Sequence, residues 1–519
     1  MAHDVPLPAP TGAPAPPGAP APVPGPLTAP APQGPPPVDL AARDRLVIGL
    51  LLASTFVVIL NETIMGVALP SLMQSLSITA VAGQWLTTAF MLTMAVVIPV
   101  TGFLLQRLHT RPVFLTAMGL FSAGTLICAA APGFGVLLAG RVVQAGGTAI
   151  MLPLLMTTVL TLVAPTRQGR VMGNISIVIS VAPAIGPSIS GIILSVLDWR
   201  WMFLAVLPIA LASLLLGALR MPNVTEPRPA SLDVPSVVVS ALGFGGLVYG
   251  LSTIGEGAAA PVPAWAPLGV GAAALAVFVR RQLRLQRADR ALLDLRTFTS
   301  RTFTVATVVL GLSVTALFGT LLVLPLYLQN VQGLDPLATG LLLLPGGLVM
   351  GLLAPVVGRV YDRSGPTVLL VPGTLVVSGA LWSLTLTSER TPVPAVLLAH
   401  VVLSVGLALI FTPLFTAGLG ALPHALHAHG SAVVGTVQQV AGAAGAALFI
   451  TVMTLGTAAS DAPGVEAAAA GVRAAFLCGA VISLLAVVGS FWVRRPAGAE
   501  DRRAAGPGLS PGRARGSAG

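Results

Sequence analysis

The sequence predicts an all-helical protein embedded in a membrane, and its composition is the first observation that supports this class. Of its 519 residues, 55% are hydrophobic and only 8% are charged, and the mean hydropathy is +0.92. A soluble domain has about 25% charged residues, so the composition excludes a soluble enzyme. The chain contains no lysine. A Walker A phosphate loop needs that lysine, so we expect neither an ATPase activity nor an ATPase partner.

The second observation is a series of fourteen apolar segments, each long enough to cross ~30 Å of hydrocarbon. In lipid, each segment must be a helix, because only a helix satisfies its backbone polar groups within the segment. A membrane β-barrel would show short alternating stretches instead. The predicted spans are residues 46–69, 80–105, 113–131, 136–162, 171–196, 201–219, 234–254, 264–280, 303–327, 337–360, 367–386, 394–418, 431–456 and 470–492.

The third observation is the uneven distribution of the arginines among the connections. With the N-terminus inside, the outer connections hold only Arg200, Arg390 and Arg473. The inner connections and the two ends hold nearly all the others, which the positive-inside rule associates with the cytoplasm. We therefore expect a multi-pass protein of the plasma membrane with both termini in the cytoplasm. The net charge of +10 is scattered between apolar runs, so it does not predict a nucleic-acid partner.

A repeated loop predicts how the spans are grouped. Gly102 to Arg107, followed by Arg111, ends the second span, and Gly358 to Arg363, followed by Gly365, ends the tenth. Two six-helix halves separated by two inserted helices explain that offset, and repeated halves are typical of transporters. The predicted organisation is a disordered Pro/Ala-rich tail at 1–45, six-helix bundles at 46–219 and 303–493, inserted helices with a basic loop at 220–302, and a disordered tail at 494–519.

Two charged side chains are predicted to lie well inside the membrane, Glu62 and Arg141. Ionisable groups are costly in lipid, so each is a functional hypothesis by default. Burial favours the neutral form of a carboxylic acid, whereas a nearby guanidinium favours the ionised form. A conformational change that alters either influence would make Glu62 bind and release a proton. The alternative is a static buried ion pair that fixes the packing of the helices.

Other polar residues give weaker signals. Asn61 and Thr63 are candidates for hydrogen bonds inside the bundle or for helix packing. His400 could titrate near neutral pH, although a lone histidine is more often a packed residue. His424, His427 and His429 lack a nearby acid or cysteine and predict no metal site. We expect no metal and no cofactor.

With these residues in place, the chain resembles the major facilitator superfamily, and within it the fourteen-helix drug:proton antiporters of the lincomycin-resistance type. The resemblance extends over about residues 46–492. Its first-helix motif is Leu60 to Pro70, with Asn61-Glu62-Thr63 where many relatives have Asp at the position of Asn61. Its fourth-helix motif is Arg141 to Gly147, and the resemblance assigns this arginine to proton transfer.

The resemblance also assigns conformational roles. The loop repeat is thought to hold the two halves together in one state; the first copy has Gln106 at the usual Asp, and the second retains Asp362 and Arg363. The antiporter motif of the fifth helix is Ala182 to Gly191, and it marks exporters in the family. Within it, Pro183, Gly186, Pro187 and Gly191 would bend the helix and let a neighbour approach.

The expected function is proton-coupled efflux of small apolar or amphipathic compounds, such as drugs or antibiotics, with the substrate and protons as partners alongside the lipid bilayer. Apolar walls discriminate weakly between hydrophobic compounds. The polar candidates for the cavity are Asn61, Thr63, Gln144, Thr436, Gln438 and Gln439. The alternatives are an exporter dedicated to one endogenous metabolite or antibiotic, and a membrane receptor or scaffold without transport.

Overall fold

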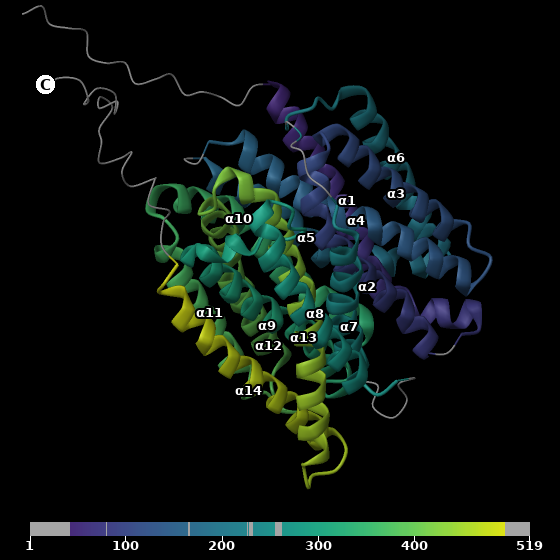
Figure 1. Cartoon of the computed structure of the whole chain (residues 1–519). Coiled ribbons are helices and arrows are strands. Elements are labelled where there is room, and N and C mark those ends of the chain that lie inside the picture. The colour runs from purple at the N-terminus through teal and green to yellow at the C-terminus, as the bar shows by residue number, and fades with distance from the viewer. Residues whose placement is uncertain are drawn as a thin grey trace, which may run out of the picture. The chain divides into compact units, whose positions relative to one another are not determined.

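The fold was described from a computed structural model, and every element in it is helical (Figure 1). The structure describes residues 42–493 except 79, 165–166, 226, 228–231 and 255–261. Both predicted tails therefore lie outside the described residues, apart from the segment 42–45, which belongs to the first helix. Within the described ranges, twelve helices are long and apolar enough to cross a membrane; α5 and α8 are not among them.

The first six helices pack against one another as one bundle. α1 packs on α4, α5 and α6, while α4 also packs on α2 and α3, and α3 packs on α6. Their bounds are α1 (Ala42–Leu76), α2 (Ala80–Arg107), α3 (Thr110–Ala129), α4 (Phe134–Leu162), α5 (Gln168–Val196) and α6 (Arg200–Arg220).

The last six helices repeat this arrangement. α9 packs on α12, α13 and α14, α12 also packs on α10 and α11, and α11 packs on α14. Each contact has its counterpart in the first bundle when α9 is matched to α1, α10 to α2, and so on. Their bounds are α9 (Arg301–Asn330), α10 (Pro336–Ser364), α11 (Thr367–Leu384), α12 (Val393–Gly420), α13 (His427–Ala458) and α14 (Val465–Ser490).

Two further helices, α7 (Val234–Thr253) and α8 (Trp265–Leu285), form a hairpin between the bundles in the sequence. Asp233 caps α7 by accepting a hydrogen bond from the Ser236 amide, and Arg281 of α8 donates to both of its carboxylate oxygens at 2.7 and 2.8 Å. This arginine lowers the pKa of Asp233 to about 2. The salt bridge holds the start of α7 to the end of α8.

The bundles meet along two seams. One is formed by α5 with α10, and the other by α2 with α13; α7 packs on both helices of the second seam. Contacts between loops place most of the arginine-bearing connections at one end of the bundles. Arg43 contacts the Asn223 carbonyl, Arg111 hydrogen-bonds the same loop, and Asp362 contacts the start of α5. We call this the basic end.

Candidate functional site

A cavity of about 500 Å³ lies between the two bundles. Its walls come from α1, α2, α4 and α5 on one side and from α9, α10, α12 and α13 on the other. Most of the lining is apolar or aromatic, and thioethers contribute on both sides. The apolar lining includes Phe90, Met91, Met94, Met151, Leu152, Phe318, Leu321, Leu324, Met350, Phe411 and Phe415.

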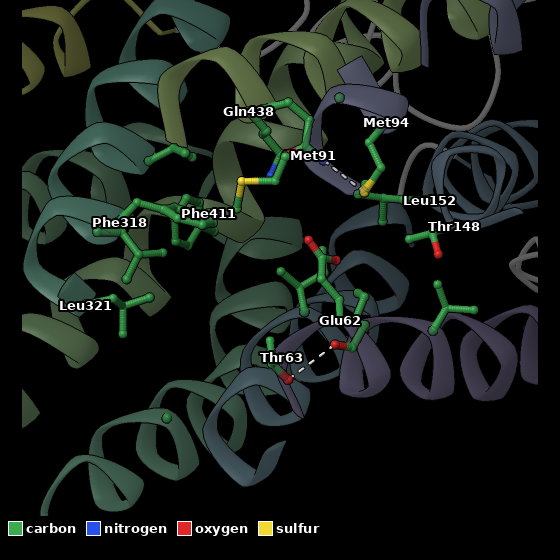
Figure 2. A pocket seen from close by; sticks show the side chains of 18 of the residues that line it. Glu62, Thr63, Met91, Met94, Thr148, Leu152, Phe318, Leu321, Phe411 and Gln438 are labelled. Atoms are coloured by element: carbon green, nitrogen blue, oxygen red, sulfur yellow. Dashed lines mark hydrogen bonds between the residues drawn. The ribbon is translucent and has the colours of Figure 1, made fainter. Parts of the chain in front are cut away.

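Glu62 and Arg141 are the charged side chains among the described residues that line this cavity. The Glu62 side chain is half-buried and points away from α1 into the space bordered by Met91, Gln438 and Phe411 (Figure 2). Within the described residues its carboxylate has no hydrogen-bond or salt-bridge partner. A carboxylate placed in this way is stabilised only by water or by a ligand in the cavity, so it gains much from taking up a proton.

Arg141 reaches the cavity wall from α4 but is almost completely buried, with 1% of the residue exposed. One guanidinium nitrogen donates to Gln144 Oε1 at 2.5 Å and to Asn61 Oδ1 at 3.5 Å. The guanidinium also lies over the Phe90 ring, 4.0 Å from its centroid, which stabilises a desolvated cation. Its Nε has no hydrogen-bond partner in the part of the chain that the structure describes. The two buried charges form no salt bridge with each other in the described structure, so the static ion pair is not the arrangement seen here.

Three of the predicted polar residues are not among those that line the cavity, and two of them hold Arg141. Asn61 and Gln144 are both buried, and each presents its amide oxygen to the guanidinium. The Gln144 amide nitrogen in turn donates to Thr125 Oγ1 at 2.8 Å. Thr436 is buried too, and its hydroxyl donates to the carbonyl of Ala432 in its own helix.

The remaining polar candidates do line the cavity. Thr63, Gln438 and Gln439 are in its walls. The Thr63 hydroxyl donates to backbone carbonyls of α1 and, at 3.5 Å, to Ala182 of α5. The Gln439 amide nitrogen contacts Met94 Sδ at 3.2 Å across the two bundles. These side chains provide neutral hydrogen-bonding groups in the same cavity as Glu62.

Hydrogen bonds between the bundles close the cavity on its basic side. The hydroxyls of Thr157 and Ser431 are 3.2 Å apart, and those of Ser176 and Thr412 are 2.7 Å apart. The first pair joins α4 to α13 and the second joins α12 to α5, which are equivalent pairs of helices in the two bundles. Both contacts hold the bundles together between the cavity and the basic end.

Asp362 fastens the α5–α10 seam at the basic end. Its two carboxylate oxygens accept hydrogen bonds from the backbone amides of Gly169 and Arg170, each at 2.9 Å. These amides belong to the first turn of α5, where the helix dipole favours a negative charge. Gly358 packs directly on Gly169, and Gly365 ends α10 with a φ of 83°. Arg363 lies in the last turn of α10.

The first copy of the loop repeat makes a different contact. The Gln106 amide nitrogen is 2.8 Å from His429 Nε2 at the start of α13, and Gly102 packs on the same imidazole. Arg107 ends α2. Arg111 hydrogen-bonds the Ala218 carbonyl in the last turn of α6 and the Asn223 side chain in the loop that follows.

The antiporter motif lies in α5 beside α1. A Cβ on Gly186 would overlap the Thr63 hydroxyl, so this glycine allows α5 to approach α1 next to Glu62. Gly191 has open space around its Cα. Pro183 and Pro187 fall within the bounds of α5, but their side chains lie outside the described residues.

Two features of the site have no clear signal in the sequence. Phe90 is one of many aromatic residues in apolar helices, and only its position over Arg141 distinguishes it. His429 lies just before the predicted span 431–456, but it is buried in the first turn of α13. His424 stacks on His427, and no group of three or more metal-ligating side chains is found among the described residues.

Comparisons with known proteins agree with this architecture. Residues 51–446 match the Major Facilitator Superfamily, and the chain belongs to this family of transporters. It is therefore a multi-pass integral membrane protein and not an enzyme.

Two relatives illustrate its place in the family. The lincomycin resistance protein LmrB of Listeria monocytogenes is 38% identical over 86% of this chain and 96% of its own length. The multidrug resistance protein B homolog of Mycobacterium tuberculosis is 30% identical over 79% of this chain and 77% of its own. The human organic anion transporter MFSD10 shares the fold, with a TM-score of 0.62, 16% identity, and coverage of 87% of this chain and 100% of its own.

Proposed function

We propose that the chain exports small apolar or amphipathic organic compounds, drugs among them, in exchange for protons. The observation that supports this most directly is the unpaired Glu62 carboxylate in an otherwise largely apolar cavity. The relatives named for lincomycin and multidrug resistance support the same substrate class. Apolar walls with few fixed polar groups favour breadth over selectivity.

The proposal places the protein in the plasma membrane with fourteen spans and both termini in the cytoplasm. The basic end then faces the cytoplasm, as the arginine distribution requires. Two six-helix bundles, at 46–219 and 303–493, move relative to each other, with the inserted pair at 220–302 between them. Because the closed side of the cavity is the basic side, the conformation described here faces outward.

In the proposed cycle, Glu62 takes a proton from the outside while the cavity faces outward. Its neutral form is then compatible with a closed, dry cavity, because burying a charge without a partner is costly. After the bundles rock, the proton leaves to the cytoplasm and the substrate enters. Arg141 acts as a fixed positive charge that favours the ionised carboxylate during this step.

The test compares Glu62→Gln with the wild type in proteoliposomes. Ethidium transport driven by an imposed pH gradient should fall at least about tenfold, because the glutamine amide cannot exchange a proton. Ethidium exchange without a gradient should persist, which shows that the variant is folded. Glu466→Gln, an exposed acid in the first turn of α14, should behave like the wild type. Unchanged gradient-driven transport in Glu62→Gln would refute the coupling role.

A further inference from the structure

The structural repeat extends to the walls of the cavity. Gly147 of α4 packs on Ala117 and Phe121 of α3, and Gly406 of α12 packs in the same way on Gly373 and Val377 of α11. When the two helices are aligned at these glycines, Arg141-Val142-Val143 is matched to His400-Val401-Val402. His400 therefore occupies in the second bundle the position that Arg141 occupies in the first.

The helix that covers this position is also related by the repeat. When α2 and α10 are aligned at Gly102 and Gly358, Phe90 is matched to Gly346. Phe90 covers the Arg141 guanidinium with its ring, while a Cβ on Gly346 would overlap His400 Nε2. The same corner of each bundle thus holds a basic side chain against α2 or α10, and in the second bundle a glycine makes the room.

The surroundings of His400 show which form of the imidazole fits this conformation. His400 lines the cavity wall but is only 7% exposed. Its Nε2 is 3.2 Å from the Leu343 carbonyl of α10, so Nε2 bears the hydrogen and donates it. Nδ1 is buried and has no hydrogen-bond partner among the described residues. A neutral imidazole satisfies this arrangement, whereas a second N–H on Nδ1 would have no acceptor.

Among the described residues, no charged side chain forms a salt bridge or hydrogen bond with His400 that would compensate a proton on it. The described parts of the helices packed against α12 contribute other ionisable groups away from this contact, and the lining across the cavity contributes Glu62 and Arg141. On the packed helices these groups are Arg170 of α5, Arg301 and Tyr327 of α9, Arg359, Tyr361, Asp362 and Arg363 of α10, and His427 and His429 of α13; the described residues of α11 include none.

We propose that His400 is a second proton-binding residue of the cavity, in addition to Glu62, and that its protonation releases α10 from α12. The inference rests on the proposed function. A proton from cavity water adds to Nδ1, and the charged ring must then turn toward water, because a buried donor without an acceptor is costly. This movement breaks the bond to Leu343, next to Pro345 and Gly346. α10 also bears Asp362, so the release is transmitted to the α5–α10 seam.

The experiment measures ethidium affinity of the purified full-length protein between pH 5 and 8, by fluorescence anisotropy. By linkage, the slope of log Kd against pH counts the protons exchanged on binding. We expect a slope approaching two for the wild type and about one for His400→Gln, which keeps a donor for Leu343 but cannot take up the proton.

A second variant tests the geometry. Gly346→Ala displaces the imidazole and should also reduce the slope to about one, and adding it to His400→Gln should change nothing further. Gly379→Ala, at a helical glycine of α11 with open space around it, is the matched control and should retain the wild-type slope.

Each other outcome decides between the two proposals. Equal slopes in His400→Gln and the wild type would overturn the role of His400 while leaving that of Glu62 intact. Loss of ethidium binding in both His400→Gln and Gly346→Ala would also overturn it, because it would make His400 a substrate contact. A wild type without any pH dependence would overturn the proposed function itself.

Discussion

The two seams between the bundles are related by the internal repeat, yet they are held together by different chemistry. At the α5–α10 seam, the Asp362 carboxylate accepts two backbone hydrogen bonds at the positive end of a helix. At the α2–α13 seam, the equivalent contact is between the neutral Gln106 and His429. The first contact is charge-assisted and the second is not.

The seams also differ in how closely their backbones approach. A Cβ on Gly358 would lie 2.9 Å from the Gly169 carbonyl carbon, whereas one on Gly102 would lie 3.4 Å from His429 Nδ1 and 3.6 Å from the Ala428 oxygen. The α2–α13 seam is in turn supported by α7, which packs on both of its helices. The comparison indicates that one seam is a tight charged latch, while the other is a looser contact with an added helix beside it.

Replacing Asp362 by Asn should have the largest effect on this difference. Charge-assisted hydrogen bonds contribute about 1.5–3 kcal/mol. Losing them should raise the fraction of molecules that are open at the basic end about ten- to a hundredfold. Double electron–electron resonance would measure this population through the distance between spin labels at Asn174 and Arg359. The labels are placed in a background in which Cys128 and Cys478 are changed to Ser.

A matched control is Asp335→Asn, since Asp335 also accepts a backbone hydrogen bond at a helix start but within its own helix, α10. It should leave the distance distribution unchanged. If Asp335→Asn opened the basic end as much as Asp362→Asn, the latch would not reside in the seam.

Replacing Gln106 by Leu should have a smaller effect. A neutral hydrogen bond contributes about 0.5–1.5 kcal/mol, so the open population should rise only about two- to tenfold, measured with labels at Leu108 and His424. At acidic pH, Gln106→Glu should instead lower the open population, because a carboxylate would pair with protonated His429. A Gln106→Leu effect as large as that of Asp362→Asn would remove the contrast between the seams.

Asp233→Asn should have the smallest effect, because its partner Arg281 is partly exposed. Since the pKa of Asp233 is lowered to about 2 in the fold, its stabilising contribution is complete above its ordinary pKa of about 4. That contribution disappears as the pH falls to about 2. The unfolding temperature at pH 7 should drop by about 1–2 °C, and wild type and variant should converge near pH 2.

The position of the labels sharpens this last prediction. Because α7 lies against the α2–α13 seam, Asp233→Asn should broaden the distribution of distances between the labels at residues 108 and 424. The distances between the labels at residues 174 and 359 should not change. Asp198→Asn is the control, since its 3.9 Å contact with Arg200 lies at the other end of the bundles. Equal broadening at both seams would show that α7 does not support one seam selectively.

The fold class was predictable because it depends on composition. The two central charges were predictable because ionisable residues are rare inside apolar segments. Apolar segments of sufficient length must be helices in lipid, and Glu62 and Arg141 stand out because an ionisable group inside such a segment is costly. The resemblance of the loop copies identified Asp362 as the better latch residue, and the structure places its carboxylate on the first turn of α5.

The orientation of side chains around the helices was not predictable in the same way. The spans are apolar on nearly every face, because lipid and the bundle interior both accept apolar groups. Sequence periodicity therefore cannot distinguish Gln438, which lines the cavity, from Gln144, which is buried and holds Arg141. The start of α1 at Ala42, before the predicted span, has a related cause, since a helix can continue beyond the hydrocarbon.

The residues alone specified a helical transporter-like membrane protein with one acid and one base deep inside it, since those properties follow from how each segment interacts with lipid. Only the packing of α2 against α13 and of α10 against α12 decided that Gln106 meets His429 and that His400 occupies the counterpart of the Arg141 position. Such contacts join residues far apart in the chain, and their distances depend on how glycines in different helices allow the backbones to approach.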